Sequence, residues 1–214
     1  MNLGGNIDGD KRSVTALAIW ESASPPPDTP VETYAASRQL QLPPTDALRF
    51  HSALRHPKGG VWPAMVALVS TVDDKPIAIH RTFLARDGRG KAPIDPAKMM
   101  LGPCRGCAVR LATPRDLLMV GEGIETCFAA MQATGYPAWA ALSTSGLRSL
   151  ELPSDIRNLI ILADGDEAGA AAALHAGLRW KREGRRVRIA RPPSGFDFND
   201  VLLGRHTSDI GAAS

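Results

Sequence analysis

Short apolar runs alternate with helix-compatible segments along the second half of the chain. The runs at 117–120, 138–142 and 159–163 are apolar throughout, and 186–190 alternates basic and apolar residues. Runs this short, bounded by polar residues, predict strands, and continuous apolar runs predict burial on both faces of a sheet. Strands that alternate with helices predict a parallel sheet with right-handed crossovers. We therefore expect an α/β unit over residues 116–204.

The helices of this unit have recognisable ends. Gly135 closes a helix over 124–134, and Gly184 closes a longer one from 168 to about 183. A short helix is expected around 147–150. In the long helix an apolar stripe is predicted from residues at helical spacing, namely Ala171, Leu174 and Leu178.

The first half of the chain has a different pattern. Two β-rich runs, 63–72 and 76–84, flank a polar turn and predict a β-hairpin, and 47–56 predicts a further short strand. Thr29 as N-cap, Pro30 in the first turn and Glu32 predict a helix start. We expect a smaller, mostly antiparallel α+β subdomain over 31–115 and a tail over 205–214.

The amino-terminal stretch lacks a strong pattern. Residues 1–12 are rich in Gly, Asn and Asp, 13–20 are compatible with the start of a helix capped by Ser13, and 24–30 are rich in proline. We expect residues 1–30 to form a flexible segment and a stiff linker.

The charge is unevenly distributed between the two halves. The net charge of the 214 residues is +3, with 15 Lys+Arg against 11 Asp+Glu in residues 1–116 and 10 against 11 in residues 117–214. Nine basic residues and two acidic ones lie between Lys75 and Arg115. Either this segment is a solvated positive face or it follows the phosphates of a nucleic acid. A basic half beside an acidic cluster favours a polyanionic partner met at a metal site.

Acidic residues follow two of the predicted strands. Asp164 and Asp166, separated by Gly165, come directly after the run at 159–163, and Glu122 lies between two glycines after 117–120. The carboxyl ends of parallel strands share one edge of a sheet, which is where ligands bind in open α/β folds. Close carboxylates repel one another unless a cation or a proton intervenes, and oxygen ligands suit Mg²⁺ or Mn²⁺. The alternative is that Asp166 only caps the next helix and that Glu122 only interacts with a helix dipole.

Two further carboxylates, Asp197 and Asp200, follow the last predicted strand. A parallel sheet would bring them to the same edge as the other three. We expect a divalent metal site there with Glu122, Asp164, Asp166, Asp197 and Asp200 as candidate ligands.

The number of cysteines and the hydropathy of the sequence indicate where in the cell the protein is located. Three cysteines are too few for a disulfide framework, and Cys104 and Cys107 form only half of a zinc site, so no zinc is expected. The chain has no signal-peptide pattern and no apolar run long enough for a membrane span. We expect a cytoplasmic protein that does not bind a membrane.

Three separated motifs resemble one known family. Gly121-Glu122-Gly123 after a strand, 164–169 (Asp-Gly-Asp-Glu-Ala-Gly) after another, and 195–201 (Gly-Phe-Asp-Phe-Asn-Asp-Val) resemble the Toprim domain in its primase branch. The resemblance covers about 117–203. It implies a Rossmann-like parallel sheet flanked by helices, preceded by a smaller α+β subdomain, as in the catalytic core of bacterial and phage (DnaG-type) primases.

The resemblance also implies an activity. It implies synthesis of short RNA primers on single-stranded DNA from nucleoside triphosphates, with Glu122, Asp164 and Asp166 as catalytic residues, and a replicative helicase as a partner of a phage or plasmid protein. By looser resemblance in the first half, Arg81, Lys91 and Lys98 would hold phosphates of template and nucleotide.

The sequence departs from that family in having neither a zinc-binding module nor a helicase part. Two alternatives therefore stay open. One is a Toprim nuclease that cleaves phosphodiesters with the same acids, and the other is a non-catalytic nucleic-acid-binding accessory of a mobile element.

Overall fold

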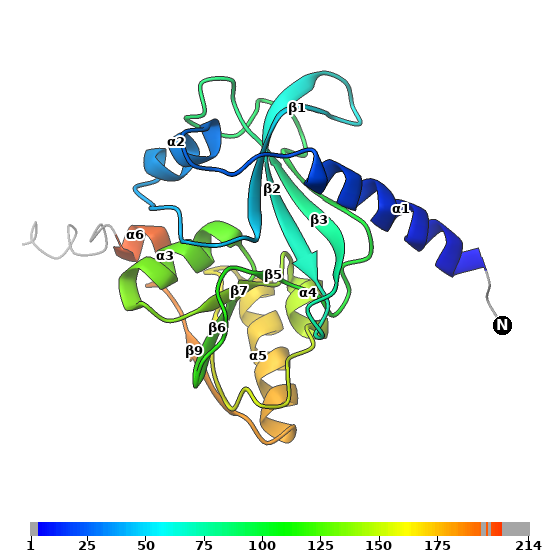
Figure 1. Cartoon of the computed structure of the whole chain (residues 1–214). Helices are drawn as coiled ribbons and strands as arrows, with labels where there is room; N and C mark the ends of the chain where they lie inside the picture. The colour runs from blue at the N-terminus through cyan, green and yellow to red at the C-terminus, as the bar shows by residue number, and fades with distance from the viewer. Residues whose placement is uncertain (1–3, 194–195, 197, 203–214) are drawn as a thin grey trace, which may run out of the picture. The chain divides into compact units, whose positions relative to one another are not determined.

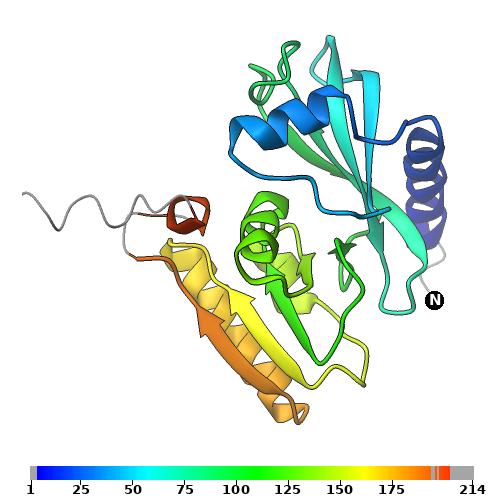
Figure 2. The ribbon, with the colours of Figure 1, turned by 60° about the vertical axis from the view of Figure 1, so that its left-hand side comes forward.

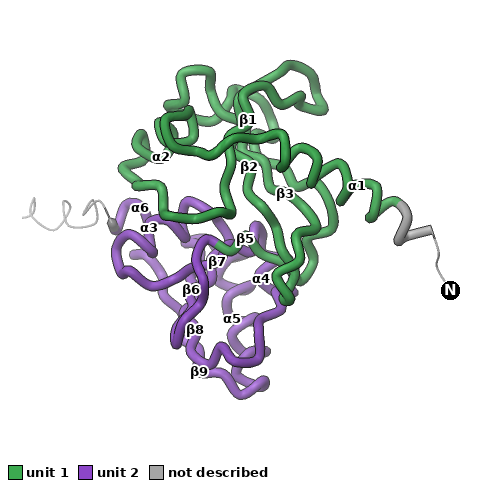
Figure 3. Tube along the Cα trace, viewed as in Figure 1, with its two compact units in different colours: residues 1–110 green, residues 111–214 purple. Residues whose placement is uncertain are grey.

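The structure is a computed structural model, which describes residues 4–193, 196 and 198–202. The chain divides into two compact units, residues 1–110 and 111–214 (Figure 3). Each unit has its own β-sheet. No helix among the described residues is long and apolar enough to span a membrane.

The amino-terminal unit is built on a four-stranded antiparallel sheet in the order β1-β2-β3-β4 (Figure 1). The predicted hairpin is present, because β2 and β3 pair from Ala64 opposite Phe83 to Ser70 opposite Pro76. The fourth strand was not expected from the sequence. The strands are β1 (Leu48–Arg55), β2 (Val61–Ser70), β3 (Pro76–Phe83) and β4 (Lys98–Leu101).

Gly4–Glu21 forms helix α1, which includes residues 13–20, where a helix was expected, and begins nine residues before Ser13. Ala16 and Trp20 of α1 are buried against Val66 and Ile79 of the sheet. The helix is stable because this apolar surface is covered, not because of local signals: its first turn has no acidic residue and its last turn has no basic one.

Helix α2 (Pro30–Ser37) begins where the sequence predicts. The side chain of Thr29 accepts a hydrogen bond from Val31 N, and Pro30 occupies the first turn. Glu32 does not complete a capping box on Thr29, since its Oε2 accepts from Asp28 N at 2.7 Å. The cap nevertheless satisfies donors that would otherwise be exposed at the helix start.

The predicted parallel sheet has the order β5-β7-β6-β8-β9, and all of its strands except β5 belong to the carboxy-terminal unit. Four of its strands are mutually parallel. Strand β6 lies between β7 and β8, which follow it in the chain on opposite sides. The strand order therefore reverses at β6, and α/β folds bind ligands beyond the carboxyl end of a strand at such a position. The strands are β5 (Val109–Arg110), β6 (Leu117–Gly121), β7 (Ala138–Ala140), β8 (Asn158–Leu162) and β9 (Arg186–Ala190).

Helices cover this sheet, and Figure 2 shows α5 running along one face of β8 and β9. Gly135 ends α3 in a left-handed conformation, φ 70°, as predicted. The short α6 packs against α3. The helices are α3 (Ile124–Thr134), α4 (Thr144–Ser149), α5 (Glu167–Arg182) and α6 (Phe198–Leu202).

The apolar stripe predicted for α5 is wrong. Leu174 and Leu178 are 53% and 47% exposed, and Ala171 is exposed as well. The buried face carries smaller residues and one tryptophan: Gly169, Ala172, Ala173, Ala176, Gly177 and Trp180. Small residues let the helix backbone approach the sheet closely, and an added Cβ at Gly177 would already lie 3.4 Å from Ile161 Cδ1.

Candidate functional site

Three of the predicted acidic residues leave the parallel sheet on adjacent strands. Gly121, the last residue of β6, pairs with Leu162, the last residue of β8. Glu122 follows β6 directly, and Asp164 and Asp166 follow β8. The shared register therefore brings these carboxylates to one edge of the sheet, which we call the acidic edge.

The electrostatics of Glu122 show how close these groups are. Burial, followed by the charges of Asp164 and Asp166, raises the pKa of the Glu122 carboxyl from 4.5 to about 7, and the charge of Arg148 opposes this rise. Its Oε1 is buried and makes no hydrogen bond within the described part of the chain. A half-buried carboxyl with two anionic neighbours and an unsatisfied oxygen suits a cation ligand.

Asp166 has a structural role that does not exclude a chemical one. Its Oδ1 accepts a hydrogen bond from Gly169 N at 2.6 Å and caps α5. Gly169 is required here, because a Cβ would lie 3.0 Å from Asp164 Cβ and 3.1 Å from Asp166 Oδ1. The cap fixes the side chain of Asp166 and leaves its second oxygen available as a ligand.

The carboxylates do not form one closed cage. Among the residues that the structure describes, no three carboxylate, imidazole or thiol groups converge on a single ion. Mg²⁺ is usually held by one or two carboxylates, with waters and substrate phosphates completing its shell. The arrangement fits two open positions, one at Glu122 and one at Asp164 and Asp166.

The remaining two candidate ligands are Asp197 and Asp200. Asp197 lies outside the described residues. Asp200 is in α6, and its charge is not among those that shift the pKa of Glu122. The segment before α6 does pass beside the acidic edge, since a Cβ on Gly165 would lie 3.4 Å from Phe196 O.

One charged residue at this edge was missed from the sequence. Arg148 lies on α4, which begins after β7, and its charge acts on Glu122. The turn into α4 is tight: Leu142 has φ 72°, and a Cβ on Gly146 would lie 2.0 Å from Ala141 O. The Ser- and Gly-rich stretch at 143–146 follows a predicted strand, so it could have indicated that a further functional residue lies at the acidic edge. Nothing in that stretch identifies the residue as Arg148.

In the amino-terminal unit Arg81 is a buried cation. It is 6% exposed, its Nη2 donates to Met100 O at 3.3 Å, and its guanidinium lies 5.8 Å from the ring centre of Phe83. Its Nε is buried without a hydrogen bond within the described part of the chain. Burial, followed by the charge of Arg12, lowers its pKa.

The structure does not bring the three predicted phosphate-binding residues to one face of the sheet. Lys98 pairs with Thr82, the neighbour of Arg81, so Lys98 and Arg81 point to opposite faces. Lys91 is exposed in the loop between β3 and β4, where it bridges to Leu84. A ligand could contact more than one of these three residues only if it reached the edge of the sheet or the loop between β3 and β4.

Two family comparisons divide the chain in the same way as the structure. Residues 10–111 match a domain of unknown function, DUF7146. Residues 117–207 match the Toprim domain, and this range contains the paired strands β6 and β8 that Glu122, Asp164 and Asp166 follow. Residues 117–207 are a Toprim domain.

Solved structures share the fold of the chain. A DNA primase domain from Pseudomonas aeruginosa is 16% identical with a TM-score of 0.56, over 92% of this chain and 78% of that one. The primase fragment of the bacteriophage T7 primase-helicase is 16% identical with a TM-score of 0.53, over 83% and 67%. The RNA polymerase domain of Mycobacterium tuberculosis primase DnaG, in complex with double-stranded DNA, is 16% identical with a TM-score of 0.51, over 94% and 78%. At such identities the likeness concerns the fold alone. No curated protein matches the sequence.

Outside the Toprim domain, Cys104 and Cys107 are not joined in a disulfide. Burial raises the pKa of the Cys104 thiol to about 11, with a further contribution from Cys107 and an opposing one from Arg12. The two thiols supply only half of the four ligands that a structural zinc site needs.

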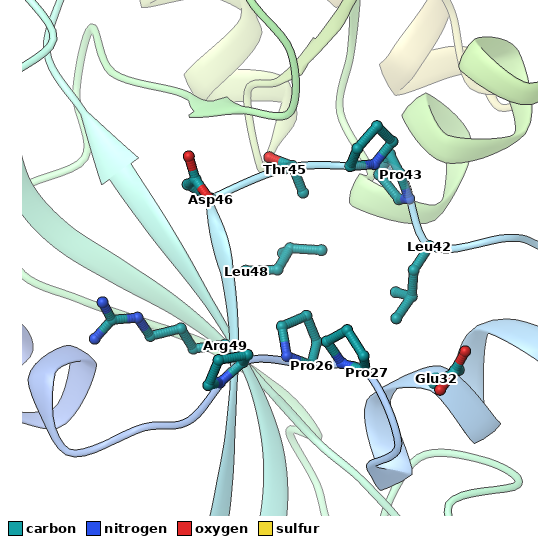
Figure 4. A pocket seen from close by; sticks show the side chains of 11 residues that line it. Pro26, Pro27, Glu32, Leu42, Pro43, Thr45, Asp46, Leu48 and Arg49 are labelled. Atoms are coloured by element: carbon teal, nitrogen blue, oxygen red, sulfur yellow. The ribbon is translucent and has the colours of Figure 1, made fainter.

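The amino-terminal unit also contains a pocket of about 630 Å³, shown in Figure 4. Prolines at 25–27 and 43–44 form much of its wall, and Glu32 and Asp46 contribute carboxylates. Its one basic lining residue among those described, Arg49, stacks on Trp20 at 4.5 Å and donates to Trp20 O. A pocket with two carboxylates and a cation already engaged is poorly suited to phosphates, so we do not assign nucleotide binding to it.

Proposed function

We propose that this chain is a primase catalytic core that makes short RNA primers on single-stranded DNA by metal-dependent nucleotidyl transfer. The observation that carries the proposal is the coupling of Glu122, Asp164 and Asp166 at one edge of a Toprim sheet. The fold shared with primase cores supports it.

Asp164 and Asp166 are proposed to hold the metal that accompanies the triphosphate. Asp166 is pre-oriented by its hydrogen bond to Gly169 N, so it loses little conformational freedom when it binds. The bound Mg²⁺ or Mn²⁺ would supply charge neutralisation at the α-phosphate, where the 3′-hydroxyl attacks and pyrophosphate leaves.

Glu122 is proposed as the ligand of a second metal or as a proton acceptor. With a pKa of about 7 it is partly protonated at neutral pH in the ion-free protein. A cation beside it would favour the ionised form, whereas general-base catalysis would use the raised pKa directly. If Glu122 is a metal ligand, the bound metal should lower its pKa and keep it ionised. If Glu122 is the general base, its raised pKa should persist when the metal binds.

The basic residues of the amino-terminal unit are proposed to bind phosphates of the template and nucleotide. Lys98 is partly exposed and Lys91 is exposed, which makes them the first candidates for contact. Arg81 is buried and already donates to Met100 O, so we expect it to act on a phosphate only through its remaining donors.

Single-stranded DNA and nucleoside triphosphates are the proposed substrates, and a helicase is a proposed partner. One structural relative was solved with double-stranded DNA. Another is a fragment of a primase-helicase. Both observations concern those proteins and motivate the choice of partners to test here.

The test is primer synthesis without a supplied primer. Purified protein would be incubated with mixed single-stranded templates, Mg²⁺ or Mn²⁺ and labelled ribonucleoside triphosphates. We expect short products from the parent protein and a loss of about 100-fold or more in Asp164→Asn, because a negative ligand becomes neutral at the metal. Asp155→Asn removes an exposed carboxylate from the same domain and should leave the yield unchanged.

The competing functions give different products in the same reaction. Degradation of the template by the parent, lost in Asp164→Asn, would establish the nuclease instead. Template binding without synthesis or cleavage, in Mg²⁺ and in Mn²⁺, would overturn the catalytic proposal and favour a binding accessory.

A further inference from the structure

The Toprim unit is electrically polarised. Residues 117–214 contain ten Lys and Arg, and seven of them fall within 179–191. That segment comprises the last turn of α5, the turn at Gly184 and strand β9. The cations up to Arg186 therefore lie near the amino ends of the strands, away from the acidic edge, whereas Arg188 is in the middle of β9 and Arg191 follows its carboxyl end. In Figure 2 the turn between α5 and β9 is at the opposite end of β9 from its arrowhead.

Two of these cations hold the fold together. Arg179 donates to Leu150 O at 2.5 Å. Arg185 donates to the carbonyls of Ile156, Leu152 and Pro153 at 3.0–3.1 Å and pairs with Glu183. Glu183 also approaches Arg179 at 4.0 Å, so its charge is already engaged.

Other cations in this region have no such role. Their side chains are exposed, and none makes an ion pair or side-chain hydrogen bond within the described residues. Arg157 and Arg186 are neighbours, since Arg186 N donates to Arg157 O across the two strands. Arg186 and Arg188 point to the face of β9 opposite α5, because Val187 and Ile189 lie beside Gly177 of that helix. Lys181 and Arg182 are in the last turn of α5. We call this group the basic end, and it consists of Arg157, Lys181, Arg182, Arg186 and Arg188.

Local stability explains only part of this charge. Lys181 and Arg182 interact favourably with the carboxyl end of the α5 dipole, and arginines on the edge strand β9 discourage unwanted strand pairing. Neither effect requires five exposed cations over the end of α5, the start of β9 and the residue before β8. Two exposed acids, Asp116 and Asp155, precede β6 and β8 at this end of the sheet, and they leave a clear positive excess.

We propose that the basic end is a second nucleic-acid contact, which binds the sugar-phosphate backbone of DNA without reading its sequence. The choice of nucleic acid among polyanions rests on the proposed function. Arginine dominates the group, and its forked donors match phosphate oxygens. The nearby Trp180 is fully buried and offers no surface for base stacking, so the contact is with phosphates.

Most of the contact lies away from the reacting groups, and Arg188, which pairs with Ile160, is its member nearest to the acidic edge. Helix α5 has 16 residues and separates Asp166 from Arg182, so the two ends are about 24 Å apart at 1.5 Å per residue. That distance equals about seven nucleotides of B-form rise. The basic end would therefore hold nucleic acid while the acidic edge stays free for the triphosphate and its metal.

The test compares DNA affinity with its salt dependence in two triple variants. Arg182→Gln, Arg186→Gln and Arg188→Gln together remove three cations of the basic end. Lys11→Gln, Arg55→Gln and Lys58→Gln remove three exposed cations from the amino-terminal unit, with the same change in net charge. Affinities for a labelled oligonucleotide of about 30 nucleotides, single-stranded and duplex, are measured from about 50 to 200 mM salt with EDTA present.

We expect the first variant to lose about 10-fold or more in affinity for both DNA forms. We also expect its slope of log affinity against log salt to fall by about 2, since each lost phosphate contact removes about 0.7–0.9. Circular dichroism and a melting curve check that the variant is folded. Equal losses in the two variants would overturn the proposal, because net charge and not the basic end would then set affinity.

A competitor separates nucleic acid from an acidic protein. Polyglutamate at equal charge concentration should displace DNA from the parent protein only weakly, and displacement as effective as that by unlabelled DNA would contradict the proposal. The outcome is independent of primer synthesis, because Asp164→Asn should bind DNA like the parent while failing to prime. Loss of priming without loss of DNA binding thus concerns the proposed function alone.

Discussion

At the scale of single residues, Glu122 concentrates the electrostatic conflict of the Toprim unit. It is half-buried, an oxygen of its carboxyl has no hydrogen bond within the described residues, and two aspartates lie near enough to raise its pKa. Protein interiors tolerate such a group only when a proton or cation neutralises it. The ion-free protein should therefore be destabilised when Glu122 ionises.

This conflict predicts how stability depends on pH. The folded pKa of about 7 lies above the ordinary value of 4.5, so the stability that Glu122 contributes is present below 4.5 and is lost as pH rises through 7. Glu122→Gln should gain stability relative to the parent across this range. Because much of the side chain stays in contact with water, we expect a gain of about 1 kcal/mol at pH 8. Urea unfolding in EDTA at pH 5 and pH 8 measures it, and a difference that does not change with pH would contradict it.

Trp20 has a comparable importance for the amino-terminal unit. It is 5% exposed, packs on the sheet from α1 and stacks on the guanidinium of Arg49. We expect Trp20→Ala to cost about 3 kcal/mol or more in the free energy of unfolding. Val14, 70% exposed on the same helix, provides the control, since Val14→Ala should change stability by less than about 0.5 kcal/mol. Denaturant titration decides it, and equal effects would mean that α1 does not pack as described.

At the scale of elements, the start of α5 combines folding and chemistry in one side chain. Asp166 caps the helix through Gly169 N and is also proposed to hold a metal. The sequence left these two roles as alternatives, and the cap is confirmed. Substitutions can separate them, because asparagine caps a helix as well as aspartate does but carries no charge.

We therefore predict different outcomes for two substitutions at this position. Asp166→Asn should keep the stability of the ion-free protein within about 0.5 kcal/mol, whereas Asp166→Ala should lose about 1 kcal/mol with the cap. Both should lose metal binding and primer synthesis. Thermal unfolding in EDTA separates the variants, and an Asp166→Asn protein that primes like the parent would remove Asp166 from the metal site.

Helix ends were predicted correctly from single residues that act on the local backbone. Thr29 and Gly135 mark a helix start and a helix end that the structure reproduces. The start of helix α1 was placed too late, at Ser13, because the helix is stabilised by burial of Trp20 against distant strands and not by a local signal at its beginning. The apolar face of α5 was misplaced because leucines outrank alanine and glycine in hydrophobicity, while close packing on the sheet selects the small residues.

At the scale of the whole molecule, the acidic edge could be predicted from the sequence, but the arrangement of the phosphate-binding candidates Arg81, Lys91 and Lys98 could not. Parallel strands bring their carboxyl ends together whatever their order, so Glu122, Asp164 and Asp166 could be grouped from the sequence alone. For Arg81 and Lys98 the face depends on the register between β3 and β4, which depends on a loop that the sequence does not specify. The contrast between the acidic edge and the basic end likewise needed the structure, because it separates engaged arginines from free ones.

The central claim is that the acidic edge binds a divalent metal together with a nucleoside triphosphate. The most direct measurement is Mn²⁺ binding, by titration calorimetry or by the paramagnetic signal of the free ion, with and without a ribonucleoside triphosphate. Since no closed cage of three ligands is present among the described residues, we predict weak binding of Mn²⁺ alone and stronger binding of the metal-nucleotide complex, both lost in Asp164→Asn and kept in Asp155→Asn. Binding that is unchanged in Asp164→Asn would contradict the account.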